Sequence, residues 1–106
     1  MALTRDYKET VLARIKRDPA FAKALYAEAL DAILTGETAG GLSMLRDLVH
    51  AEISFKELAS QTGCNEKSLH RMLSSRGNPT ARTLAKILAA IRDDLGYVPR
   101  VQVATA

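Results

Sequence analysis

A short segment of the sequence, KSLHRMLS, carries cationic and hydroxyl side chains at the spacing of a helix. Its polar members recur every three or four residues, so on a helix they would share one face: Lys67, His70, Arg71 and Ser74. Its apolar members would occupy the opposite face: Leu69, Met72 and Leu73. Arginine and lysine on an exposed face bind phosphate oxygens and the acceptor atoms of guanine, and serine hydroxyls donate to either. The segment therefore indicates binding to a polyanion, with a solvated helix face as the simpler alternative.

Candidate contacts to a nucleic acid extend on both sides of this segment. The full set is Glu66, Lys67, Ser68, His70, Arg71, Ser74, Arg76, Asn78, Thr80 and Arg82. Lys67 and Arg71 are the strongest, because arginine forks onto guanine and lysine does so less rigidly. Glu66 opposes phosphate but can accept a hydrogen bond from the amino group of cytosine. Ser68 suits helix capping equally well, and a lone exposed histidine such as His70 often has no role.

The candidates that follow the segment are suited to the phosphate backbone. Arg76 and Asn78 would lie in a loop beside it, although Asn78 suits capping of the next helix at least as well. Thr80 and Arg82 begin that next helix, whose N-terminal amides and positive dipole end favour a phosphate.

Three residues are spaced to hold two short helices across each other. Ala59 is small enough for a close crossing, Gly63 tolerates the positive φ of a tight turn, and Leu69 would point back into the crossing. This arrangement is typical of a helix-turn-helix, whose second helix lies in the major groove of DNA. A helical hairpin with no role in nucleic-acid binding is the alternative.

Helical signals recur along the whole chain. The expected helices span residues 3–17, 19–34, 42–51, 55–62, 66–75 and 79–94. Four starts carry a capping residue: Asp18, Ser54 with Glu57 as a reciprocal capping box, Asn65, and Asn78 before Pro79. Inward residues are expected to be Phe21, Ala24, Leu25, Ala29 and Ile33 in the second helix, and Leu42, Leu45, Leu48 and Val49 in the third. The segment GETAGG, residues 36–41, is expected to be a turn.

The C-terminal segment differs from the rest. Residues 97–103 contain three valines, which favour extended structure, while Pro99 restricts the segment to an edge strand or an irregular extension. A lone strand leaves backbone groups unpaired, so this tail is expected to form part of a homodimer interface.

Composition predicts one all-α domain of five to six helices. The 106 residues comprise a helical lead-in at 1–41, a helix-turn-helix unit at 42–96 and a tail at 97–106. Residues 65–92 carry six basic side chains and one acidic one, whereas residues 1–41 carry six of each. This distribution favours a polyanion on the second half.

The residue inventory argues against catalysis, a metal and a cofactor. Cys64 is the single cysteine, which excludes an internal disulfide and a multi-cysteine zinc site. His50 and His70 have no catalytic partner at a recognisable spacing, and GETAGG lacks the lysine of a phosphate-binding loop. The charged N-terminus is unlike a signal peptide, and no apolar run is long enough for a membrane span. A cytoplasmic, nucleoid-associated protein is expected.

The segment LASQTGCNEKSLHRMLSSRGNPTARTLAKIL resembles the helix-turn-helix of phage-repressor-like (XRE-type) regulators. More narrowly, KSLHRMLSSRGNPT resembles the addiction-module antidote proteins, the HigA-type antitoxins. The resemblance covers residues 18–97 and is most specific over 54–79. Two residues depart from the family pattern: Cys64 replaces a branched aliphatic residue, and Glu66 places an acid in the recognition helix.

The resemblance implies a lambda-repressor-like fold and a DNA-binding transcriptional regulator. It implies a repressor that acts as a homodimer on a palindromic operator in double-stranded DNA, and that also serves as the antitoxin of a cognate toxin. The alternative is a helical protein-interaction module that binds a partner protein without binding DNA.

Overall fold

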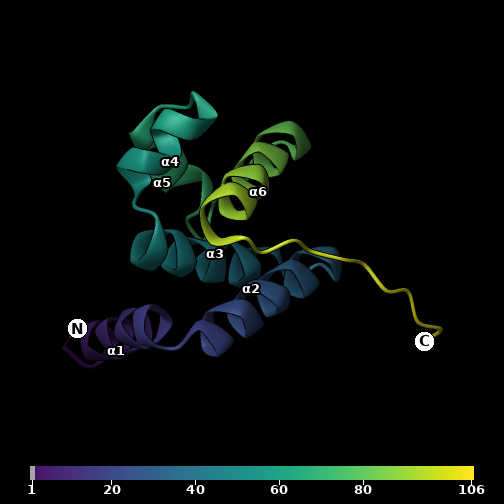
Figure 1. Ribbon diagram of the computed structural model, residues 1–106, viewed down its shortest axis with the longest axis horizontal. Helices are drawn as coiled ribbons and strands as arrows, with labels where there is room; N and C mark the ends of the chain where they lie inside the picture. The colour runs from purple at the N-terminus through teal and green to yellow at the C-terminus, as the bar shows by residue number, and fades with distance from the viewer. Residues whose placement is uncertain (1) are drawn as a thin grey trace.

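A computed structural model describes the backbone of residues 2–106 and the side chains of residues 7–106. Over this range the chain forms six helices and no strand, which confirms the expected all-α class. The helices are α1 (Ala2–Arg17), α2 (Pro19–Leu34), α3 (Thr38–Glu52), α4 (Phe55–Thr62), α5 (Glu66–Met72) and α6 (Ala81–Leu95). The central helix α3 packs against α1, α2 and α4, and α4 packs against α5 and α6 (Figure 1).

Three of the expected helix starts are capped as the sequence indicates. Asp18 Oδ1 and Ser54 Oγ each accept a 3.1 Å hydrogen bond from the backbone N–H three residues further on. Asn65 Oδ1 accepts hydrogen bonds from the second and third amides after it, at 2.9 and 3.3 Å. The second hydrogen bond of the predicted capping box, from the Ser54 N–H to the Glu57 side chain, is wrong. The Ser54 N–H donates to the Val49 carbonyl at 2.8 Å instead.

The turn expected at residues 36–41 is shorter than its composition suggests. Helix α3 begins at Thr38, so TAGG forms its first turn and the boundary expected between residues 41 and 42 falls inside this helix. Packing explains the difference. A Cβ on Gly41 would lie 2.5 Å from Ile33 Cγ1 and 2.7 Å from the Ala29 carbonyl oxygen. The glycine therefore allows α2 and α3 to approach closely, and this contact outweighs its low helix propensity.

The two helices on either side of residues 73–80 are shorter than expected. Helix α5 ends at Met72 and not at residue 75, and the Ser74 hydroxyl donates to the Arg71 carbonyl at 2.7 Å beyond its last turn. Helix α6 begins after Thr80 and not after Asn78. The Thr80 hydroxyl accepts a 3.1 Å hydrogen bond from the amide three residues on, so the second of two competing caps is used.

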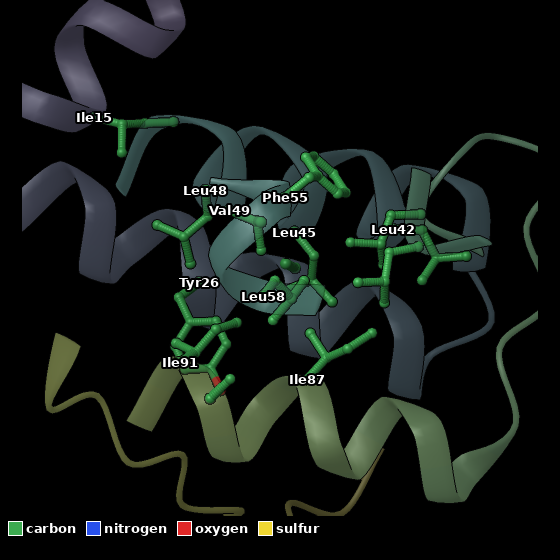
Figure 2. Packing of buried hydrophobic residues seen from close by; sticks show 14 of the residues in the cluster. Ile15, Tyr26, Leu42, Leu45, Leu48, Val49, Phe55, Leu58, Ile87 and Ile91 are labelled. Atoms are coloured by element: carbon green, nitrogen blue, oxygen red, sulfur yellow. The ribbon is translucent and has the colours of Figure 1, made fainter. Parts of the chain in front are cut away.

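One hydrophobic core joins all six helices. Figure 2 shows Leu45, Leu58 and Ile87, from α3, α4 and α6, pointing toward one another. The expected inward residues of α3 are confirmed, because all are fully buried or nearly so: Leu42, Leu45, Leu48 and Val49. In α2 the expected face is partly wrong. Ala24 is exposed, while Ala22 and Tyr26 are buried.

The C-terminal tail is an extension without regular structure in the single chain. Figure 1 shows it crossing the helices after α6 and then projecting away from them. Residues 98–106 are all exposed, and the edge strand that the valines allow is not formed in the described residues. Among the helices described here, none has both the length and the apolar character that a membrane span requires.

Candidate nucleic-acid interface

The turn between α4 and α5 is built as the sequence predicts. Gly63 has a φ of 74°, in the left-handed region, and its N–H donates to the Ala59 carbonyl at 3.0 Å. Leu69 is fully buried, so α5 is held against the core by the side opposite its cations. Thr62 strengthens the turn: its hydroxyl donates to the Leu58 carbonyl at 2.8 Å within α4. Two short helices are thereby fixed across each other.

Cys64 packs within this turn. Its side chain is half-buried and adjoins the hydrophobic core, which fits the expected small packing residue. Its N–H donates to the Thr62 hydroxyl at 3.3 Å, so the residue's structural contacts are local to the turn.

The exposed face of α5 is cationic. Lys67 and Arg71 are both exposed and lie one helical turn apart. Glu66 is exposed in the first turn of the same helix. In the described part of the chain, no carboxylate lies within ion-pair distance of Lys67 or Arg71. The two cations are therefore free to bind an external anion.

His70 does not share this exposure. Its ring stacks on Phe55, with a centroid distance of 3.8 Å and an interplanar angle of 19°. The histidine is half-buried, and it ties the middle of α5 to the start of α4. The sequence pattern missed this contact because residues 55 and 70 lie on different helices.

Two of the candidate hydroxyl groups have structural partners. The Ser74 hydroxyl donates to the Arg71 carbonyl, and the Thr80 hydroxyl caps α6, where it also contacts the Thr83 hydroxyl at 3.1 Å. Ser68 is half-buried in the first turn of α5. Most of the candidate residues that remain exposed without a structural role are therefore charged. Asn78 is the one candidate with an amide side chain, and it is exposed.

The loop between α5 and α6 contains a residue whose role the sequence analysis missed. Gly77 donates its N–H to the Ser74 carbonyl at 2.9 Å. A Cβ at this position would overlap the backbone carbonyl of Met72 and lie 2.9 Å from the Arg71 carbonyl oxygen. The loop therefore curls tightly onto the end of α5, and the exposed Arg76 lies within it. The only signal in the sequence was the glycine itself within GNP.

Three further exposed cations follow α5 in the chain, one in the loop after it and two on α6. Arg76, Arg82 and Lys86 are exposed, and within the described residues none forms an ion pair. Arg92, further along α6, differs because its Nε lies 3.1 Å from an oxygen of Asp93. The five exposed cations of α5, α6 and the loop between them that form no ion pair among the described residues are called the basic surface below: Lys67, Arg71, Arg76, Arg82 and Lys86. Such a surface can neutralise phosphates along a nucleic-acid backbone.

The described residues contain no cluster of three or more His, Cys, Asp or Glu side chains that could hold a metal ion. The comparisons with known proteins add no relative: no family model, curated protein or solved structure matches this chain.

Proposed function

We propose that this protein is a sequence-specific DNA-binding transcriptional regulator, and that it acts as a homodimeric repressor on a palindromic operator. The observation that carries the proposal is the unpaired, exposed pair Lys67 and Arg71 on a short helix. That helix follows a left-handed glycine turn and is anchored by buried Leu69. A short helix fixed in this way can enter the major groove with its cations foremost.

The basic surface supports a large electrostatic contribution to binding. If each of its five cations neutralises one phosphate, the logarithm of the association constant falls with the logarithm of salt concentration with a slope of about −4.5 per copy. A half-site of a few base pairs gives little specificity alone, which favours two copies on a palindrome.

The test is a titration of labelled duplex DNA from upstream of the protein's own gene, followed by fluorescence anisotropy against unrelated duplex. The double variant K67A/R71A is expected to lose at least about 30-fold in affinity for the specific duplex, since each good base contact contributes about 1–3 kcal/mol. Its melting temperature should be nearly unchanged, because both side chains are exposed.

The matched control is K16A/R17A, which removes two exposed cations from α1. We expect it to bind like the parent chain. Equal binding by K67A/R71A and the parent would contradict the assignment of α5 as the recognition helix. A chain that shows no salt-dependent retention on any duplex would favour the alternative, a helical protein-interaction module.

We further propose that the protein is an antitoxin whose cognate toxin binds mainly the helices before Gly41, α1 and α2. The support is the resemblance of residues 18–97 to antidote proteins, together with the neutral balance of residues 1–41, which leaves the basic surface available for DNA. Deleting α1 and α2 would not test this proposal, because both helices contribute residues to the hydrophobic core and the remaining chain would be destabilised. Substitutions of exposed residues in α1 and α2 should abolish co-purification with the product of a neighbouring small gene while DNA affinity is retained.

A further inference from the structure

The fully buried residues of α5 lie along a single line on this seven-residue helix. Leu69 within the helix and Leu73 at its C-terminal cap are both fully buried. Residues four apart lie one above the other on a helix, so these two leucines fix how deeply α5 sits in the core. They leave its rotation about that line free. Lys67 and Arg71 lie on the opposite side, where such a rotation moves side chains the most.

The rotation of α5 matters more for contacts to bases than for contacts to phosphates. An α-helix with its side chains has a radius of about 6 Å, so a rotation of about 20° moves the outer ends of side chains by about 2 Å. A hydrogen bond to a base edge tolerates only a few tenths of an ångström. Non-specific binding depends mainly on how many phosphates are neutralised. A helix with the right charges and the wrong rotation would therefore bind DNA without reading it.

A directional contact lies beside the line of buried leucines: the stack of the His70 ring on that of Phe55. The ring centroids are 3.8 Å apart and the ring planes differ by 19°. His70 lies about 100° around the helix from Leu69, on the flank that leads to Lys67. Rotation of α5 would slide one flat ring off the other, so the stack opposes it. On the other flank Met72 is partly buried, but methionine is a flexible side chain that adapts to a shift.

Phe55 is itself held in place by the backbone before it. Ser54 has φ 97° and ψ 150°, a region that residues other than glycine rarely occupy, and it is the one such residue in the described chain with a positive φ. Two hydrogen bonds hold this conformation: the Ser54 N–H donates to the Val49 carbonyl at 2.8 Å, and the Ser54 hydroxyl accepts from the Glu57 N–H at 3.1 Å. Phe55 is only 4% exposed. The ring beneath His70 is thus a fixed platform.

We propose that His70 is a positioning residue, which sets the rotation of α5 through its stack on Phe55 and does not itself contact DNA. The stack thereby fixes where Lys67 and Arg71 meet the edges of the bases. The effect on DNA recognition rests on the proposed function, whereas the hold of the stack on α5 is a property of the free chain. The two parts are tested by separate measurements.

Amide hydrogen exchange of the full chain without DNA tests the hold on α5. His70→Ala should speed exchange of the α5 amides about three- to tenfold, as expected for the loss of one aromatic pair, and leave α3 unchanged. His70→Phe keeps a flat ring and should exchange like the parent. The matched control is His50→Ala, which removes the exposed histidine from the last turn of α3. The proposal is overturned if His70→Ala exchanges like the parent, or if His70→Phe exchanges as fast as His70→Ala.

Fluorescence anisotropy with the protein's own duplex and with unrelated duplex tests the effect on recognition. His70→Ala should lose about tenfold in affinity for its own duplex, the equivalent of one base contact. Its affinity for unrelated duplex and its salt dependence should be unchanged, because all five cations of the basic surface remain. His70→Phe should bind like the parent. A loss in His70→Phe equal to that in His70→Ala would show that the imidazole contacts DNA, and equal weakening on both duplexes would show a general loss of structure; each would overturn the proposal.

A double-mutant cycle approaches the same contact from its other side. Phe55→Leu keeps an apolar side chain in the core and removes the ring on which His70 stacks. Its loss of affinity for the specific duplex should match that of His70→Ala, and the double variant should lose no more than either, because each change removes the same contact. Losses that add would overturn the proposal. A parent chain without preference for its own duplex would contradict the proposed function instead, and hydrogen exchange would still decide whether the stack holds α5.

Discussion

In the first half of the molecule, α1 to α3, two basic side chains bridge or brace its helices through partners in the same half, whereas the cations of the basic surface in the second half form no ion pair among the described residues. Lys8 Nζ lies 2.9 Å from an oxygen of Asp47, which joins α1 to α3. Arg14 lies 3.8 Å from Asp18 and 4.2 Å above the ring of Phe21. The five cations of the basic surface have no such partners among the described residues.

The two halves also use glycine differently. In the first half Gly41 brings two long helices into contact, so it serves packing. In the second half Gly63 and Gly77 shape the turns on either side of α5, so they serve its orientation. The glycine of the first half thus serves the packing of long helices, while the glycines of the second half fix a short helix that carries unpaired cations on its exposed side.

The substitution Gly77→Ala should have the largest effect on stability. Its Cβ would overlap the Met72 carbonyl, and neither backbone can move without breaking the loop that returns from α5 to α6. We expect the free energy of unfolding to fall by about 3 kcal/mol, at the upper end for overpacking. Urea denaturation measures it, and a loss below about 1 kcal/mol would show that the loop is not held as described.

Next in size is Gly63→Val. No atom lies within 4 Å of a Cβ placed there, so the cost comes from the backbone alone. A left-handed residue costs about 1–2 kcal/mol, and a β-branched side chain resists that region more strongly, so a loss of about 2–3 kcal/mol is expected. The control is Gly63→Asn, since asparagine tolerates positive φ and should cost less than about 1 kcal/mol. Equal melting temperatures for the parent, Val and Asn chains would contradict the left-handed turn.

The local features of the site were predictable from the sequence. The caps at Ser54 and Asn65 depend on a side chain and an amide only two or three residues away. The role of Gly63 depends only on its own φ angle, and the burial of Leu69 follows from the periodicity of a single helix. Such features do not depend on how the helices pack. The first residues of α4 and α5 were therefore predicted correctly from the sequence.

The features that the sequence did not reveal depend on contacts between distant segments. The stacking of His70 on Phe55 joins two helices, and the helical state of Thr38 to Gly41 depends on the approach of α2. The start of α6 was ambiguous because Asn78 and Thr80 are both good caps. Tertiary packing decides such cases, and a one-dimensional pattern does not contain it.

Two adjacent glycines test the packing role of the first half. Gly41→Ala would force a Cβ against the Ala29 carbonyl and Ile33, and should cost about 1–2 kcal/mol after its gain in helix propensity. Gly40→Ala meets no atom within 4 Å and should stabilise the protein by about 0.5–1 kcal/mol. Thermal unfolding of the two variants side by side is the measurement. Shifts of the same sign would show that α2 and α3 are not in the close contact described.

The smallest expected effect tests the charges directly. Lys8→Met removes the ion pair to Asp47, whose carboxylate side chain is only 15% exposed, and leaves that group without its cation. We expect the free energy of unfolding to fall by about 0.5–1 kcal/mol, and added salt should reduce this loss because the lysine is 44% exposed.

The matched variant in the second half is Lys67→Met. It removes a cation that has no partner, so the free energy of unfolding should change by less than about 0.5 kcal/mol. For binding to duplex DNA the order should be reversed, with Lys67→Met weakening it and Lys8→Met leaving it unchanged. A Lys67→Met chain that loses stability as much as Lys8→Met, while binding DNA like the parent, would mean that the cations of the two halves do not differ in role.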